Sequence, residues 1–333
     1  MKKNIVLFGL LLLVLSSCER DDAAFEGPAL DDIYGPFVVL QDFDITDRSV
    51  DFEAGETTTF TALFSKQVDW EVQIKGLESG AIKSITGFSA ELSTSNARWT
   101  GTTTEIPLFK EEMCAVELRV PSDTLVVYDT LNVTGVRNIT GFVVADFENG
   151  FQPGWTGFVQ SGADMSFNIT DDIPAAQGSK YYDMGGAVDW DWLIGLIDFP
   201  ATAYGAPHFP LSTDPANIYF NVMLYLPQGI TNEVVLFQFR EDDNGDNIYS
   251  ENNEDIFSLE VKNLEAGWHQ ISLRYGDLAT LVNGAPASPI GNGLYEPHKL
   301  FKISVLFLAN PNSGYSQTLM DYLIFTTGGP LVP

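Results

Sequence analysis

The chain has 333 residues, of which 45% are hydrophobic and 12% aromatic, enough to bury a sizeable core in about two domains. Acidic residues outnumber basic ones by 45 to 17, which gives a formal net charge of -28. A field of this sign repels nucleic acid and anionic lipid headgroups, so it excludes both as expected partners and suits neutral or cationic ones. The same charge is equally consistent with simple solubility in a salty medium.

The first 17 residues have the order of a bacterial export signal. Two lysines precede an apolar stretch, residues 5–15, that is too short to be a comfortable transmembrane helix. Two serines and then Cys18 follow. This order resembles the lipobox of bacterial lipoproteins, which implies a signal peptide over residues 1–17 and a lipidated Cys18 that holds the protein to a membrane by its acyl chains. The alternative is an ordinary secretory signal cleaved near Ser17.

Residues 19–22, which are three acids and one arginine, follow the cysteine directly. They resemble the surface-export signal of lipoproteins from Bacteroidetes-type bacteria, and the alternative is a merely solvated tether. The resemblance implies a protein of the outer membrane that faces the cell exterior. Residues 18–35, with Pro28 and several acids, predict a flexible tether.

Residues 36–138 predict a small β-sandwich. Turn signals separate short alternating runs at residues 37–40, 57–64, 68–74, 116–120 and 125–133. Trp70 resembles the core tryptophan of an immunoglobulin-like domain, although the usual inter-sheet cysteine pair is missing. Cys114 lies in an apolar run and is most simply a buried thiol, and a core position is favoured for Trp99 over an exposed one. With no catalytic constellation, this domain is expected to be a spacer.

Residues 139–333 predict a second, larger domain, so the whole chain is expected to be all-β. The domain opens with the run 142–150, carries Gly267 and Trp268 at the start of a central strand, and closes with the run 321–325. In this order the three pieces resemble the galactose-binding-like jelly roll of many carbohydrate-binding modules. The resemblance implies a structural calcium ion shared by Glu148 and Asp321 with backbone carbonyls. The alternative is that both acids only cap strands or bind loop amides.

The centre of this domain is a long acidic loop between alternating runs. The runs 234–240, 256–261 and 268–275 predict a β-meander, and a loop as long as the one after the first run is usually functional or disordered. Asp242, Asn244 and Asp246 alternate as in the first half of an EF-hand loop, which predicts a second calcium site. Asn247 stands where that loop requires glycine, so a solvated charge run is the alternative.

Sugar rings have apolar C–H faces and hydroxyl edges, so a glycan site needs aromatic platforms with polar groups at the rim. Arg240 ends a strand at the acidic loop, where it would pair with Glu241 or Asp242 or hydrogen-bond a sugar. Trp268 is expected in the core because it belongs to the fold motif. The predicted ligand-binding residues are Trp155, Trp190, Trp192, Tyr182, Arg240 and Tyr249.

No motif of a hydrolase appears in the sequence: there is no G-x-S-x-G elbow, no HExxH helix and no paired-glutamate strand motif. The chain as a whole resembles the non-catalytic surface glycan-binding lipoproteins of Bacteroidetes-type bacteria. That resemblance implies a polysaccharide ligand, an outer-membrane glycan transporter complex as partner, and membrane contact through the lipid anchor only. Two alternatives stay open: a lipid-anchored glycoside hydrolase or lyase with unrecognised carboxylates, and a structural or adhesion lipoprotein with a protein partner.

Overall fold

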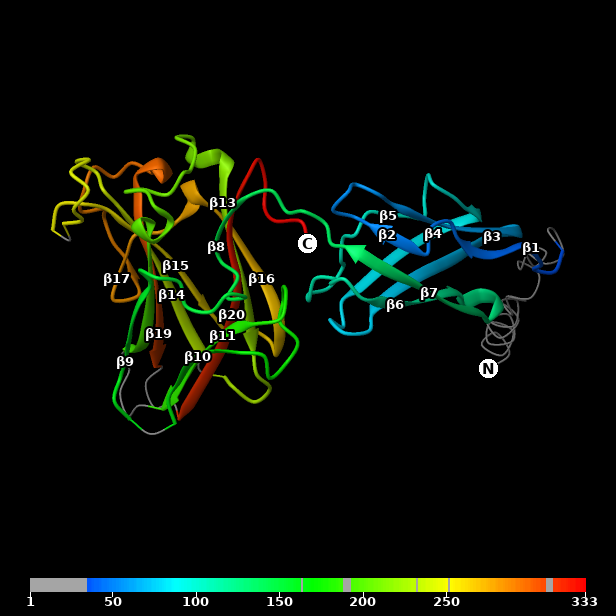
Figure 1. Cartoon of the computed structure of the whole chain (residues 1–333), viewed down its shortest axis with the longest axis horizontal. Helices are drawn as coiled ribbons and strands as arrows, with labels where there is room; N and C mark the ends of the chain where they lie inside the picture. Colours follow the sequence, from blue (N-terminus) through cyan, green and yellow to red (C-terminus); the bar gives the residue numbers. More distant parts are fainter. Residues whose placement is uncertain (1–34, 163, 188–192, 232, 251, 310–313) are drawn as a thin grey trace, which may run out of the picture.

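The computed structural model describes residues 35–162, 164–187, 193–231, 233–250, 252–309 and 314–333. In this part of the chain the protein is all-β, as predicted, with strands in two lobes (Figure 1). The helices of the described residues are 3-10 turns of three or four residues. None of these is long and apolar enough to cross a membrane.

One seven-stranded sheet makes up the N-terminal domain. Its path runs β1-β3-β6-β7-β2, with β4 and β5 paired to β3. The strands are β1 (Val39–Ile45), β2 (Ser49–Asp51), β3 (Thr58–Gly76), β4 (Ile82–Leu92), β5 (Arg98–Trp99), β6 (Met113–Val120) and β7 (Leu125–Gly135). The two strands predicted over residues 57–74 are one strand, β3. Its register with β4 shifts between Leu63 and Val68, where polar residues interrupt the alternation, so the sequence shows a break that the backbone does not have.

The predicted core residues of this domain are buried. Trp99 is completely buried and Trp70 is 2% exposed. Each indole N–H finds an acceptor: Trp70 Nε1 donates to Ser89 Oγ at 2.9 Å, and Trp99 Nε1 donates to the Thr102 carbonyl at 2.8 Å. Cys114 is also buried, and burial raises the pKa of its thiol to about 12.

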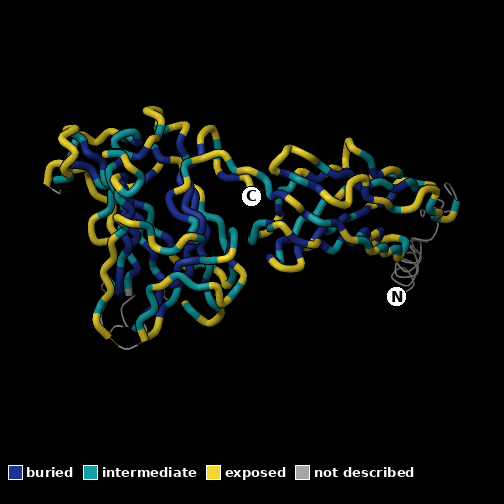
Figure 2. Tube along the Cα trace, viewed as in Figure 1, coloured by how far each residue is buried: buried dark blue, intermediate teal, exposed yellow. Residues whose placement is uncertain are grey.

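Two sheets face each other in the C-terminal domain. The six-stranded sheet has the order β10-β11-β20-β13-β16 with β8 on β20, and the five-stranded sheet has the order β15-β14-β19-β12-β9. Their strands are β8 (Phe142–Ala145), β9 (Thr156–Val159), β10 (Ser166–Thr170), β11 (Tyr181–Ala187), β12 (Leu193–Pro200), β13 (Ile218–Leu226), β14 (Glu233–Glu241), β15 (Ile256–Lys262), β16 (Gly267–Arg274), β19 (Leu300–Ala309) and β20 (Tyr315–Thr327). The buried positions gather between the sheets, where Phe220, Phe237 and Phe325 pack together (Figure 2).

The predicted meander is wrong. Strand β14 pairs with β15, but β16 pairs with β13 in the opposite sheet. The chain crosses between the sheets just after β15, with positive φ angles of 59° at Asn263 and 115° at Gly267. Because β15 and β16 each place one face on the same core, their alternating patterns look alike and do not reveal which sheet a strand joins.

The C-terminus returns to the N-terminal domain (Figure 1). The Thr103 amide donates to the Pro333 carbonyl at 3.2 Å, and the Arg137 guanidinium donates to the Val332 carbonyl. The Leu108 amide donates to the Ala176 carbonyl at 2.8 Å. The six-stranded sheet lies toward this junction, whereas the five-stranded sheet lies on the far side of the C-terminal domain (Figure 1).

Candidate functional site

The two outer faces of the C-terminal sandwich differ in what covers them. On the six-stranded sheet, Trp268 Nε1 donates to the Pro174 carbonyl at 3.0 Å and Gln270 Nε2 donates to the Leu331 carbonyl at 2.7 Å. The Leu331 amide in turn donates to Asn221 Oδ1 at 2.8 Å. The chain's own segments therefore lie over this face, and the five-stranded sheet offers the candidate binding surface.

Two parallel rows of side chains cross the outer face of the five-stranded sheet, and we call this surface the two-row face. The apolar row follows the cross-strand pairs Phe158, Leu196, Leu306 and Leu236. The polar row lies two residues away from the apolar row on β12, β19 and β14 and continues onto β15. It consists of Asp198, Ser304, Gln238 and Ser258. Phe158 is 46% exposed, so the apolar row ends in an accessible aromatic ring.

The polar row keeps hydrogen-bonding capacity that the protein itself does not use. Asp198 Oδ2 pairs with Lys302 Nζ at 2.9 Å. Asp198 Oδ1, Ser304 Oγ and Ser258 Oγ are buried and have no partner within the described part of the chain. Unpaired buried polar atoms are uncommon in folded proteins. A ligand lying on this face would meet the partly exposed members of the row, Asp198 and Gln238, rather than the two buried serines.

Arg240 and Tyr249, both predicted from the sequence, meet beside the polar row. The Arg240 guanidinium carbon lies 5.4 Å from the centroid of the Tyr249 ring, a cation–π distance. Arg240 also donates to Gln238 Oε1 at 3.3 Å, and not to Glu241 or Asp242 as one alternative expected. The acidic loop therefore brings an aromatic ring back to the end of β14.

Tyr182 is a wrong prediction, because its side chain lies on the core side of β11. It is 2% exposed and stacks on Phe147, with ring centroids 5.6 Å apart. Trp155 is half-buried rather than an open platform: its indole meets Phe199 edge-on at 4.9 Å and donates to Tyr204 Oη at 3.1 Å.

Trp268 departs from its expected core position. It is half-buried on the outer side of the six-stranded sheet, against Tyr181 and Tyr225. Trp190 and Trp192 lie outside the described residues, so their role stays a prediction.

Glu148 and Asp321, the first predicted calcium pair, both hold the segment after Ala176. Glu148 accepts from the amides of Ser179 and Lys180 at 2.7 and 2.8 Å, and Asp321 accepts from the Gln177 amide at 2.8 Å. These bonds match the alternative to a calcium site, in which both acids only cap strands or bind loop amides. Burial raises the pKa of Asp321 well above its ordinary value, and the nearby Glu148 carboxylate adds to the shift.

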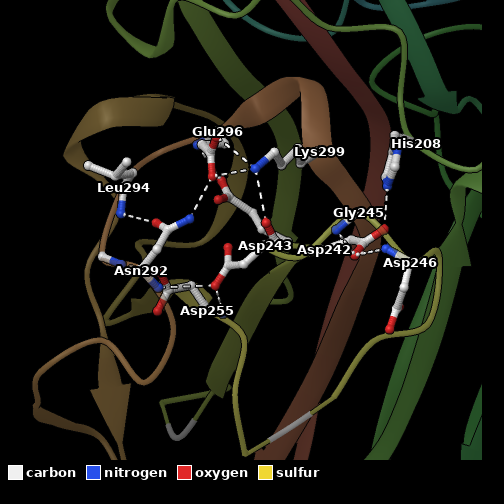
Figure 3. Close-up of polar contacts among 12 residues, drawn as sticks. His208, Asp242, Asp243, Gly245, Asp246, Asp255, Asn292, Leu294, Glu296 and Lys299 are labelled. Carbon is white, nitrogen blue, oxygen red and sulfur yellow. Dashed lines mark hydrogen bonds and ion pairs between the residues drawn. The ribbon is translucent and has the colours of Figure 1, made fainter.

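The second predicted calcium site is partly assembled in the acidic loop. Asp242, Asp246 and Glu254 each offer a carboxylate oxygen, and these atoms lie within 4.8 Å of one another. Asn244 Oδ1 instead accepts from the Asp246 amide at 2.8 Å. His208 Nε2 lies 2.9 Å from Asp242 Oδ2 (Figure 3).

The two buried acids of this loop titrate differently. Burial alone would raise the pKa of Asp242, but hydrogen bonds from His208 and from loop amides lower it. Burial raises the pKa of Glu254, whose Oε1 has no partner in the described structure. Asp242 is therefore held as a carboxylate by its own loop, whereas Glu254 has an oxygen to spare.

Sequence reasoning missed the polar row and a second carboxylate group, Glu241, Asp243 and Glu296, beside the acidic loop. The available signal for the row was polar residues within otherwise apolar strands, as at Asp198 and Ser304. Those residues are far apart in sequence, so only the strand pairing shows that they lie side by side.

No family model matches the chain, and no curated protein matches it. Several solved structures match it. A family 11 carbohydrate-binding module from Clostridium thermocellum, in complex with a β-1,3-1,4-mixed-linked tetrasaccharide, aligns with a TM-score of 0.38 at 12% identity over 57% of this chain and 98% of its own. A structure described for the promiscuous specificity of carbohydrate-binding modules of the β-sandwich superfamily gives 0.37 at 10%, over 88% and 99%. SGBP-B from a complex xyloglucan utilization locus in Bacteroides uniformis gives 0.34 at 11%, over 88% and 73%. Because these TM-scores lie below 0.5, the ligand of each neighbour stays a property of that neighbour.

Proposed function

We propose that this protein is a non-catalytic cell-surface lipoprotein that binds polysaccharide on the two-row face. The observation that carries the proposal is the apolar row beside a polar row whose partly exposed members are Asp198 and Gln238. A pyranose ring presents apolar C–H faces and a rim of hydroxyl groups, so it matches both rows at once. Arg240 beside the polar row adds a donor for a hydroxyl oxygen, and Phe158 adds a stacking surface.

The order of the N-terminal segment supports the anchored location. Cys18 as the lipidated residue and residues 19–22 as a surface-export signal would place the protein on the outer membrane, facing the exterior. The tether and the N-terminal domain then hold the two-row face away from the lipid. In that position it would capture chains for an outer-membrane glycan transporter complex.

We also propose calcium as a structural ion, at the two places predicted from the sequence. Asp242, Asp246 and Glu254 present hard oxygen ligands within 4.8 Å, with one oxygen of the buried Glu254 unpartnered. Asp321 is fully buried beside the partly exposed Glu148, and a cation would offset the cost of the buried carboxylate there.

The enzyme alternative is less well supported by the geometry. In the two carboxylate clusters around Glu241 and Asp242, the side chains of Glu241, Asp242 and Glu254 have no exposed surface, so a polysaccharide does not reach these three. Glycoside hydrolysis needs an acid and a second carboxylate on either side of an accessible sugar.

Affinity gel electrophoresis against a panel of neutral polysaccharides tests the proposal. We expect the purified protein to be retarded by at least one glycan and to release no reducing ends from it. Phe158→Ala and Arg240→Ala should each abolish most of the retardation, and Trp190→Ala tests the prediction that lies outside the described residues. Tyr128→Ala is the matched control, because Tyr128 is an aromatic residue 74% exposed on the N-terminal domain. Turnover of the glycan, or equal retardation of all variants, would overturn the proposal.

A further inference from the structure

Three carboxylates outside both predicted calcium sites meet at the end of β14. Glu241 is the last residue of that strand, Asp243 follows it in the loop, and Glu296 directly precedes the 3-10 turn Pro297–Lys299 that leads into β19. Each offers one oxygen, and the three atoms lie within 4.8 Å of one another. Figure 3 shows Asp243 and Glu296 on neighbouring segments, with the Lys299 ammonium between them.

Glu241 is completely buried but only half satisfied. Its Oε1 accepts from Tyr275 Oη at 2.7 Å and from the Glu296 amide at 2.9 Å. Its Oε2 has no partner in the described part of the chain. A carboxylate oxygen buried without a donor is costly unless a cation supplies the missing partner.

Asp243 repeats the same arrangement. Its Oδ2 accepts from the amides of Asp255 and Asn292 at 3.1 and 3.2 Å, while Oδ1 is buried without a partner in the described structure. Two carboxylates of one group thus each leave one oxygen free, and both belong to a cluster whose oxygens are already close together.

Lys299 compensates only part of the negative charge. Its Nζ contacts Glu296 at 2.9 Å and the backbone carbonyl of Asp243 at 3.0 Å, and no described hydrogen bond joins it to the Glu241 carboxylate. With all three carboxylates ionised, as cation binding requires, one ammonium leaves a formal charge of about -2. A divalent cation that prefers several oxygen ligands in flexible geometry matches this set, which is the chemistry of calcium.

We infer that Glu241, Asp243 and Glu296 form a calcium site that joins the end of β14 to the segment before β19. The segment passes directly over Asp243, because a Cβ on Gly291 would lie 1.8 Å from Asp243 Oδ2. The site is separate from the one expected at Asp242, whose oxygens accept from amides of its own loop and from His208. The ion orders the loop that places Tyr249 over Arg240, at the edge of the two-row face.

Isothermal titration of the purified, EDTA-treated protein with calcium chloride tests the site. We expect Glu241→Gln to bind one calcium ion fewer than wild type, because the substitution keeps an acceptor for Tyr275 but removes the charge. Glu296→Gln, at a half-buried position, should have the same effect and serves as the second variant if Glu241→Gln does not fold. Melting of each variant in EDTA shows whether it is folded.

Asp246→Asn is the control for the neighbouring cluster, and it should leave the ion at Glu241 in place. Sensitised terbium luminescence gives an independent readout, because the Tyr275 ring lies directly against Glu241. Tyr275→Phe should therefore change the emission without changing the number of ions bound. Equal calcium stoichiometry in wild type, Glu241→Gln and Glu296→Gln would overturn the inference. A count lowered by Asp246→Asn alone would overturn it as well.

Discussion

Both domains bury glutamates, and Glu112 and Glu241 differ in whether their oxygens have partners. Glu112 of the N-terminal domain is 3% exposed and accepts from the amides of Glu78, Ser79 and Lys110 and from Ser79 Oγ. Glu241 of the C-terminal domain is fully buried and leaves Oε2 without a partner in the described structure. A buried carboxylate whose oxygens both accept hydrogen bonds fixes the loop that donates them. One with an oxygen left unpartnered can still bind a donor or a cation.

The difference extends beyond this pair. Within the described residues, every buried side-chain nitrogen or oxygen atom without a partner belongs to the C-terminal domain, from Gln177 to Thr318. Among the described residues of the N-terminal domain, the buried polar side-chain atoms therefore have hydrogen-bond partners, as expected of a rigid support. The C-terminal domain keeps unpartnered buried polar atoms in the strands of the two-row face and in the carboxylate clusters, and the clusters are where ions are expected.

Removing Glu112 should give the largest loss of stability. Glu112→Ala leaves four donors without their acceptor, and we expect unfolding of the N-terminal domain to become easier by about 4 kcal/mol. Urea unfolding followed by the fluorescence of the buried Trp70 and Trp99 measures this change. Glu117→Ala, which removes the surface ion pair with Arg119, is the control and should cost about 0.5 kcal/mol. Similar losses for both variants would contradict the importance given to the buried network.

Loss of each calcium ion should produce the next largest effect, confined to the C-terminal domain. With free calcium about 100 times above its dissociation constant, each bound ion contributes about 2.7 kcal/mol to folding stability. At roughly 2–4 °C per kcal/mol, EDTA should lower the melting temperature of this domain by several degrees for each ion that it removes. Calorimetry with and without EDTA checks this. If EDTA lowered the melting temperature of the N-terminal domain instead, the assignment of the calcium sites to the C-terminal domain would be wrong.

The sequence predicted those features that depend on local alternation. The all-β class follows from apolar residues at every second position of short runs. Burial was expected for Trp70 from a resemblance, for Cys114 from its apolar run and for Trp99 from the general preference of its residue type, and all three are buried. Alternation alone does not show which face of a strand packs against the core. Tyr181 and Tyr182 are adjacent on β11, and only the packing shows that Tyr182 belongs to the inner face.

The binding surfaces were harder to predict because they depend on strand register. Ser304 lies between Asp198 and Gln238 only because β19 pairs with both β12 and β14 in one particular register. Glu241 and Glu296 are likewise 55 residues apart in the chain. Arg240 and Tyr249 were found because both flank one conspicuous loop. Distant carboxylates or hydroxyl groups have no such local signal.

Two buried serines allow a finer test of the same comparison. Ser79 and Ser304 are both 1% exposed. Ser79 Oγ contacts Glu112 and accepts from the Ala81 amide at 3.0 Å, whereas Ser304 Oγ has no partner in the described structure. Ser79→Ala should cost about 2 kcal/mol, and Ser304→Ala should be within about 0.5 kcal/mol of wild type or stabilise the protein. Equal losses in urea unfolding would show that Ser304 is satisfied.

The smallest expected effect is an absence of change at Cys114, which reports on the N-terminal domain alone. Because its pKa is raised to about 12, only about one thiol in 10,000 is ionised at pH 8, and burial also blocks access. In a Cys18→Ser variant, a thiol reagent should therefore react very slowly with the folded protein and rapidly in urea. EDTA should leave the slow rate unchanged, because the expected calcium sites all lie in the other domain. If chelation accelerates labelling, the two domains are coupled through their junction and the comparison between them no longer holds.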